Sequence, residues 1–217
     1  MSLPARTFAR PGVAYRLGRA LYLSLTDESN ATPLALTRGP SFVMPASSAF
    51  VCLGDAPEPR ASELVAAVDA FYDSFTIASS GEDDPGVVFA GYGEPLMRLQ
   101  TLCDTIANVR ERRHGAKLRV STNGLFDASA ARALRDAGAE SITVNLASAD
   151  PEQYARLMKP KYGRTHADAC AFVEAAAANG LQVECTAVKA PGVDVRAVER
   201  LALALGAVEF REREYFP

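Results

Sequence analysis

Hydrophobic and polar residues alternate in several short segments of the chain, and this period of two predicts β-strands. The segments are residues 21–26, 87–91, 117–123, 141–146, 181–188 and 208–213. Between them, apolar residues recur at the spacing of one helix face. The three clearest sets are Leu64, Val68, Phe71 and Phe75; Leu96, Leu99, Cys103 and Ile106; and Val195, Val198, Leu201 and Leu205. This alternation of strand and helix predicts a parallel sheet covered by helices.

The two faces of the predicted strands differ in character. The apolar positions are Leu23 and Leu25, Leu118 and Val120, Ile142 and Val144, Val183 and Cys185, and Val208 and Phe210. The polar positions are Tyr22, Ser24 and Thr26, Arg119 and Ser121, Thr143 and Asn145, Gln182, Glu184 and Thr186, and Glu209, Arg211 and Arg213. Helices can therefore cover one face only, and the other face is polar.

This polar face decides between the parallel architectures. A doubly wound sheet buries both faces, so its strands are nearly continuous in apolar residues. A closed eight-stranded barrel fills its centre with bulky branched side chains and needs more strands than the sequence offers. We therefore predict a TIM-like partial (β/α)6 barrel: six parallel strands in chain order, curled, with the last strand at one edge. Its interior would hold inward side chains such as Arg119, Asn145, Glu184 and Arg211, which need partners, water or a ligand.

Length and composition are those of one domain. The chain has 217 residues, of which 48% are hydrophobic, and we expect a single domain over residues 1–217 with an N-terminal extension over 1–20. Residues 37–60 are irregular and rich in proline. The net charge of −3 gives no reason to expect nucleic acid. Neither a membrane-spanning stretch nor a signal peptide is recognisable, so the expected location is the cytoplasm.

The four cysteines form no recognisable motif. Cys52, Cys103, Cys170 and Cys185 are widely spaced and include no Cys-x-x-Cys pair. Neither a zinc site nor a disulfide framework follows from such spacing. We predict that they are mainly small buried residues.

Candidate site residues gather where the predicted strands end, which is where partial barrels carry their functional groups. The second strand ends in Gly91, Tyr92, Gly93, Glu94 and Pro95, in which glycines admit close backbone approach and Glu94 offers an acceptor. The third and fourth strands place further polar groups at the same rim, namely Ser121, Asn123 and Asn145. We predict a pocket for a small-molecule ligand there.

With these motifs the sequence resembles one family over nearly its whole length. The successive stretches LYLSLT, VFAGYGEP, RVSTNGL, ITVNLASADPEQYARLMKP and APGVDV…ALGAVEFREREY are similar to the core of radical S-adenosylmethionine (SAM) proteins, in particular the TatD-associated radical SAM proteins. The resemblance implies SAM as a cofactor. It assigns the Gly91–Pro95 turn to the amino group of SAM, and Ser121, Asn123 and Asn145 to its methionine and ribose region.

The chain departs from that family at the iron–sulfur cluster. In the family, a Cys-x3-Cys-x2-Cys loop after the first strand binds a four-iron cluster. The resemblance places these cysteines at Ser29, Pro33 and Leu36, with Arg38 at a position that is often basic. Proline and leucine side chains offer no donor, and serine is a poor iron ligand. We expect no cluster, since Cys52 alone cannot replace three ligands.

Three functions remain open at this point. The favoured one is a degenerate radical-SAM-fold protein, a pseudoenzyme that binds a nucleoside or SAM-type ligand as a binding or regulatory module. Alternatively, an enzyme has rebuilt its chemistry in the barrel cavity, or a cluster is held by non-standard ligands or by another chain. The residues considered for rebuilt chemistry are Glu94, Arg119, Glu184, Arg211 and Arg213.

Partners are expected at the same rim. A protein partner could close the open side of the barrel, whereas a membrane is not expected as a partner. The basic stretch with Lys159, Lys161 and Arg164, followed by His166, is predicted to be a solvated loop. Because it follows the fourth strand, it could also receive an anionic substrate.

Overall fold

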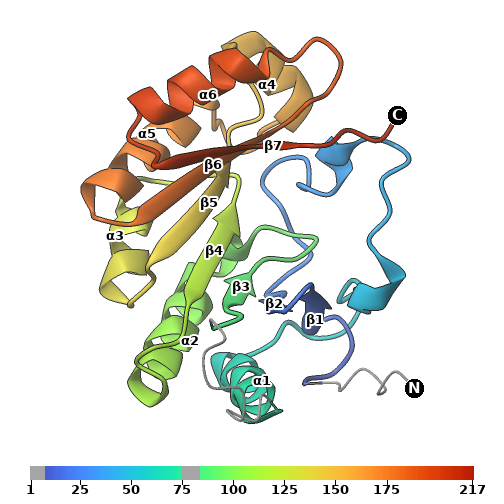
Figure 1. Ribbon diagram of the computed structural model, residues 1–217, viewed down its shortest axis with the longest axis vertical. Coiled ribbons are helices and arrows are strands. Elements are labelled where there is room, and N and C mark those ends of the chain that lie inside the picture. Colours follow the sequence, from blue (N-terminus) through green and yellow to red (C-terminus); the bar gives the residue numbers. More distant parts are fainter. Residues whose placement is uncertain (1–7, 75–83) are drawn as a thin grey trace.

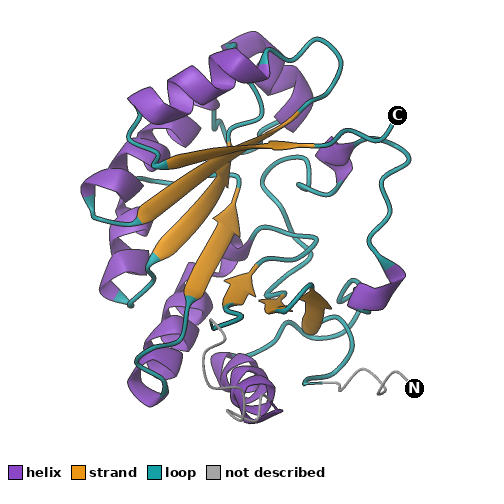
Figure 2. Ribbon diagram, viewed as in Figure 1, coloured by secondary structure: helices purple, strands orange, loops and turns teal. Residues whose placement is uncertain are grey.

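The computed structural model describes residues 8–74 and 84–217, which form one curled, open sheet with helices on its outer face (Figures 1 and 2). Seven strands follow one another in chain order across the sheet. They are β1 (Ala14–Leu17), β2 (Ala20–Leu23), β3 (Val87–Phe89), β4 (Leu118–Thr122), β5 (Ser141–Asn145), β6 (Gln182–Val188) and β7 (Glu209–Arg213). Strands β2 to β7 are parallel, so the predicted partial barrel of six parallel strands is confirmed.

An additional strand, β1, was not predicted. It pairs antiparallel with β2 and occupies an edge of the sheet within the expected N-terminal extension. A hairpin forms here because Gly18 adopts a φ of +60°, which the tight reversal of the chain requires. The extension is therefore partly built into the barrel.

Six α-helices and three short 3-10 helices connect the strands in the described residues. They are η1 (Leu36–Arg38), η2 (Ala46–Ser48), α1 (Ala61–Ser74), η3 (Pro95–Arg98), α2 (Leu99–Arg112), α3 (Ser129–Asp136), α4 (Pro151–Met158), α5 (His166–Ala178) and α6 (Val195–Ala204). The predicted stripe on α1 is buried at Leu64, Val68 and Phe71, whereas Phe75 lies outside the described residues. The three predicted apolar stripes contribute to the core between the helices and the apolar face of the sheet.

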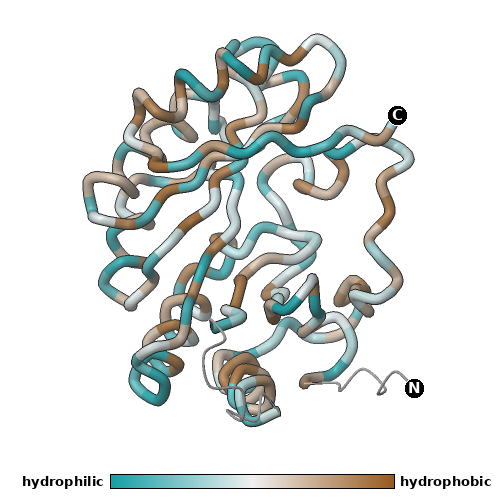
Figure 3. Tube along the Cα trace, viewed as in Figure 1, coloured by the Kyte–Doolittle hydropathy of each residue, from teal (hydrophilic) through white to brown (hydrophobic). Residues whose placement is uncertain are grey.

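The strand register aligns the polar rows across the sheet. Ser121 lies beside Thr143, and Asn145 lies beside Thr186, which in turn pairs with Arg211. The apolar rows face the helices, with one correction: Val208 is 63% exposed, because it precedes β7 at the edge of the sheet. Along β7 the chain is mostly hydrophilic (Figure 3).

A long segment after β2 crosses the open side of the barrel. We call residues 36–50 the strap, and Figure 1 shows it between the C-terminal residues and β1. At one end, Phe216 N donates to Arg38 O at 2.7 Å and Ser41 N donates to Phe216 O at 3.3 Å. At the other end, the rings of Phe50 and Tyr15 meet edge to face at 4.8 Å. The chain itself thus covers part of the side that we expected a protein partner to close.

None of the helices in the described residues has the length and apolar character needed to cross a bilayer.

Candidate ligand-binding site

Two cavities occupy the inside of the barrel. The first, which we call the rim cavity, has a volume of about 820 Å³ and lies at the carboxyl ends of the strands, where Tyr92, Leu157 and Tyr215 line it. The second, the inner chamber, has a volume of about 540 Å³ and is lined by side chains of the strands, including Tyr22, Arg119 and Arg213. Strap residues such as Phe42 contribute to both, so the strap divides the interior.

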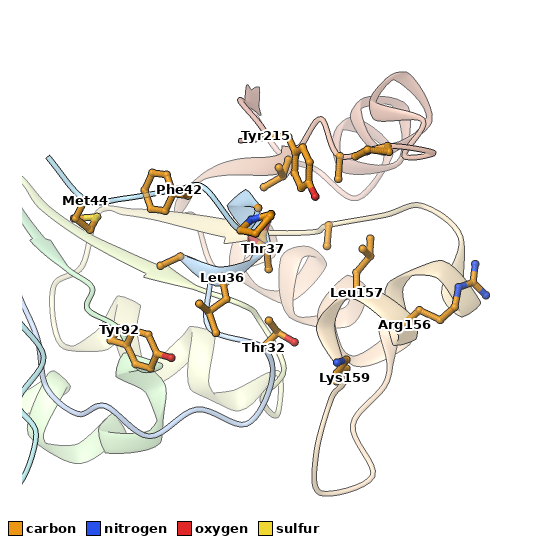
Figure 4. A pocket seen from close by; sticks show the side chains of 18 of the residues that line it. Thr32, Leu36, Thr37, Phe42, Met44, Tyr92, Arg156, Leu157, Lys159 and Tyr215 are labelled. Atoms are coloured by element: carbon orange, nitrogen blue, oxygen red, sulfur yellow. The ribbon is translucent and has the colours of Figure 1, made fainter. Parts of the chain in front are cut away.

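The rim cavity is largely apolar and aromatic. Figure 4 shows Tyr92, Leu36, Met44 and Phe42 on one side of it and Leu157 on the other. Hydrogen-bonding side chains in its lining include Thr32, Thr37 and Asn145. Arg156 also borders the cavity, but its guanidinium points away from the other labelled side chains (Figure 4). Such a lining suits a planar ligand with a few polar groups.

The glycines of the β3 turn serve close packing within the chain. A Cβ atom on Gly91 would lie 2.7 Å from Ser24 Oγ, and one on Gly93 would lie 2.5 Å from Thr26 O and closer still to Glu28 O. Any side chain at these positions would therefore collide with the segment that follows β2. Both glycines also line the inner chamber. The space beside each glycine is thus occupied by atoms of the segment after β2 and not by room for a ligand.

Glu94 is buried beneath the rim and lines neither cavity. Its Oε1 accepts hydrogen bonds from Thr122 Oγ1 at 2.6 Å and from Leu96 N at 3.2 Å, and its Oε2 accepts from Asn123 N at 2.8 Å. Burial raises the pKa of Glu94 to about 7, although these three hydrogen bonds lower it. The carboxyl group thus caps η3 and joins it to the end of β4.

The remaining predicted site residues fall into two groups: some line a cavity, and others are buried without lining one. Asn123 is buried, where its side chain donates to Asn30 Oδ1 at 2.7 Å and accepts from Leu125 N at 2.9 Å. Ser121 lines the inner chamber, and Asn145 lines both cavities and donates to Met158 Sδ at 3.5 Å. Hence Gly91, Tyr92, Gly93, Ser121 and Asn145 border a cavity, while Glu94, Pro95 and Asn123 do not.

The loop after β2 carries the three positions that the resemblance assigned to cluster ligands. Ser29 Oγ accepts from Ala31 N at 3.3 Å, and Leu36 lines the rim cavity while 57% exposed. With serine, proline and leucine at positions 29, 33 and 36, the loop does not fit a cluster bound by three thiolates. In the part of the chain that the structure describes, no three or more His, Cys, Asp or Glu side chains are grouped to hold a metal.

The cysteines do not share one environment. Cys185 is buried and Cys103 and Cys170 are partly buried, as predicted, but Cys52 is exposed and lines the rim cavity. Cys52 departs from the general expectation of burial, because it lies outside the sheet and the helices. Partial desolvation of the thiol, and then the charge of Asp27, raise the pKa of Cys52 and disfavour a thiolate.

The basic stretch after α4 mainly ties the loops together. Lys161 Nζ donates to Ser29 O at 2.9 Å, and Arg164 pairs with Asp168 at 3.0 Å. The ring of His166 packs against Tyr154 at 5.0 Å between centroids, and partial burial lowers the pKa of His166. Lys159 is the member of this group that lines the rim cavity.

Comparisons with known proteins bear on the family and the fold of the chain. Residues 76–205 match the family model described as the radical SAM superfamily. No curated protein sequence is significantly similar to the chain.

Several solved structures share the fold. SuiB of Streptococcus suis, in a crystal structure with bound S-adenosylmethionine, is 13% identical with a TM-score of 0.65 over 92% of this chain and 40% of SuiB. Methylornithine synthase (PylB) is 15% identical with a TM-score of 0.58 over 91% of this chain and 53% of its own. TYW1 with a lysine-pyruvate adduct bound is 12% identical with a TM-score of 0.58 over 92% of this chain and 65% of TYW1. The chain therefore spans about two fifths of SuiB, and the likeness is one of fold.

Proposed function

The chain belongs to the radical SAM superfamily, and on this basis we propose that it is a binding or regulatory module. In this proposal the rim cavity holds S-adenosylmethionine or a related nucleoside, and the protein carries out no radical chemistry. We place it nearest to the TatD-associated radical SAM proteins, as its sequence motifs suggest.

The loop after β2 carries this proposal. Radical cleavage of SAM needs an electron from a cluster, and such clusters are held by cysteine thiolates. Ser29, Pro33 and Leu36 supply none. Backbone groups of the same loop are already engaged, because Thr32 N donates to Met158 O at 2.6 Å and Lys161 N donates to Asn30 O at 2.8 Å. The proposal therefore keeps the pocket and omits the metal.

The rim cavity has the size and surface that such a ligand needs. Its volume of about 820 Å³ falls within the range of about 300–1,000 Å³ that is typical of small-molecule sites. The ring of Tyr92 offers a face for an adenine base, and the amide of Asn145 offers a donor and an acceptor for a ribose. Since no iron would chelate the methionine end, we expect a dissociation constant no tighter than about tens of micromolar.

Titration calorimetry with S-adenosylmethionine and S-adenosylhomocysteine tests the proposal. We expect wild type to bind at least one of them and Tyr92→Ala to weaken binding about tenfold, because the stacking surface is lost. Tyr162→Ala is the matched control, since Tyr162 is 76% exposed and lines neither cavity. Wild type that binds neither compound, or Tyr92→Ala that binds as tightly as wild type, would contradict the proposal.

A further inference from the structure

The inner chamber has an unusual charge. Its ionisable lining consists of the guanidinium groups of Arg38, Arg119, Arg211 and Arg213 together with two tyrosines, and no acidic side chain of residues 8–74 and 84–217 lines it. These arginines come from three separate parts of the chain: the strap, β4 and β7. Four like charges around about 540 Å³ repel one another unless an anion lies between them.

One neighbouring carboxylate compensates only part of this charge. Glu184 lies on β6 beside the chamber and pairs with Arg211 at 2.8 Å and with Arg119 at 3.8 Å. It also accepts a hydrogen bond from Thr143 Oγ1 at 2.8 Å. Glu184 is therefore shared between two arginines. Because these ion pairs and the Thr143 hydrogen bond hold its carboxylate, it is poorly placed for acid–base chemistry.

Arg213 and Arg38 are left without a carboxylate contact. The guanidinium of Arg213 forms no hydrogen bond or ion pair with any other described residue. Arg38 Nε donates to the backbone O of Glu214 at 3.0 Å, and its guanidinium packs 4.6 Å from the Phe42 ring centroid and 5.2 Å from that of Phe216. Burial, then Arg211 and Arg38, lower the pKa of Arg213 to about 10. The group stays charged at neutral pH while the surrounding field opposes that charge.

We propose that the inner chamber is a second ligand site, distinct from the rim cavity, for a small organic anion that carries a phosphate or carboxylate group. Guanidinium groups bind both kinds of anion through paired hydrogen bonds, and Arg213 has its donors available for this. Tyr15, Tyr22 and Phe42 supply an aromatic wall for the rest of the ligand. This site does not depend on a nucleoside in the rim cavity.

Calorimetry and thermal unfolding with inorganic phosphate and with succinate, at ionic strength held constant with sodium chloride, test the site. We expect at least one anion to bind and to raise the unfolding midpoint. Binding of phosphate alone would identify a phosphate ester as the ligand class, and binding of succinate would identify a carboxylate. If neither anion binds beyond the chloride control, the proposal is wrong.

Arg213→Gln locates the binding. We expect it to weaken binding of the anion about tenfold, because a charged bidentate partner is lost. Arg200→Gln on the exposed surface of α6 makes the same change of charge elsewhere and should bind like wild type. Arg119→Gln provides the same test should Arg213→Gln not fold. An Arg213→Gln protein that binds the anion as tightly as wild type would overturn the assignment.

The same variant separates this proposal from the function proposed for the rim cavity. Arg213 does not line the rim cavity, so Arg213→Gln should bind S-adenosylhomocysteine as wild type does. Tyr92, in turn, does not line the inner chamber, so Tyr92→Ala should keep its affinity for phosphate or succinate. Loss of both ligands in either variant would contradict the existence of two independent sites.

Discussion

The loops after β2 and β3 lie against each other at one rim of the barrel, yet they are held in different ways. The β3 loop depends on the identity of its residues, since Gly93 has no room for a side chain and Glu94 binds three donors. The β2 loop is held largely through backbone groups, such as the Glu28 carbonyl that accepts from Glu94 N at 2.8 Å. Asn30, whose buried amide donates to Leu125 O at 2.9 Å, is the main exception.

This difference shows why a family motif can stay recognisable in one loop and not in the other. Packing constrains the glycine of the β3 turn and hydrogen bonds engage its glutamate, whether or not a ligand is bound. Folding requires little of the side chains at positions 29, 33 and 36, because Ser29 makes one local hydrogen bond and Leu36 is mostly exposed. The Gly-Glu-Pro turn is therefore weaker evidence for SAM binding than its resemblance to the family motif implied.

The largest effect is expected from Gly93→Ala, which would break the contact between the two loops. The new Cβ would lie within 2.5 Å of Thr26 O, and backbone atoms cannot move aside as a flexible side chain can. We expect a loss on the order of 4 kcal/mol in the free energy of unfolding, measured by urea denaturation. Gly115→Ala is the control, because a Cβ atom at that position would meet nothing within 4 Å. Equal stability of the two variants would show that the loops are not packed as described.

An intermediate effect is expected from Glu94→Gln, and it should depend on pH. The pKa of Glu94 is about 7 in the fold against an ordinary value of 4.5, so the folded protein holds this proton more tightly than the unfolded chain does. Stability contributed by Glu94 is therefore fully present below pH 4.5, is lost as the pH rises to about 7, and stays constant above it. The loss amounts to about 3 kcal/mol.

Urea denaturation of wild type and Glu94→Gln at pH 4.5 and pH 7.5 measures this contribution. Between pH 4.5 and pH 7.5, wild type should lose about 3 kcal/mol of unfolding free energy relative to the variant, since glutamine does not titrate. The amide cannot accept from Asn123 N as well as Oε2 does, which costs about 1 kcal/mol at either pH. Glu111→Gln on the exposed surface of α2 controls for the loss of a charge. A difference that is the same at both pH values would disprove the assignment to Glu94.

The smallest effect on stability is expected in the β2 loop. A triple variant, Ser29→Cys, Pro33→Cys and Leu36→Cys, should change the free energy of unfolding by less than about 1 kcal/mol, because these side chains support little of the fold. After anaerobic reconstitution, wild type should stay colourless and the triple variant should bind iron and sulfide. The matched triple alanine variant should resemble wild type. Stoichiometric iron and sulfide in wild type would contradict the proposed loss of the cluster.

The sequence by itself determined the six parallel strands, the curl and the polar interior. Residues such as Arg119, Thr143 and Arg211 could be placed inside the barrel because side chains alternate strictly along a strand, and this is a local property. Gathering Gly91, Ser121 and Asn145 near one end was also predictable, since parallel strands bring their carboxyl ends to the same rim. The TatD-associated subfamily and the absence of a cluster stay predictions.

Only the tertiary structure decided which of these groups face a cavity. From the sequence, Glu94 and Asn123 resemble ligand-binding residues. In the structure Thr122 forms a hydrogen bond with Glu94, and Asn30 forms one with Asn123. Both partners come from other parts of the chain. The β1 hairpin and the course of the strap could not be predicted from the sequence either, because neither segment shows the hydrophobic periodicity of a strand or a helix. Arg38 meets the arginines of β7 only because Ser41 and the backbone of Phe216 pair across the open side of the barrel. Contacts between segments far apart in the chain carry no periodic signal, so packing alone turns a polar interior into an apolar rim cavity and a cationic inner chamber.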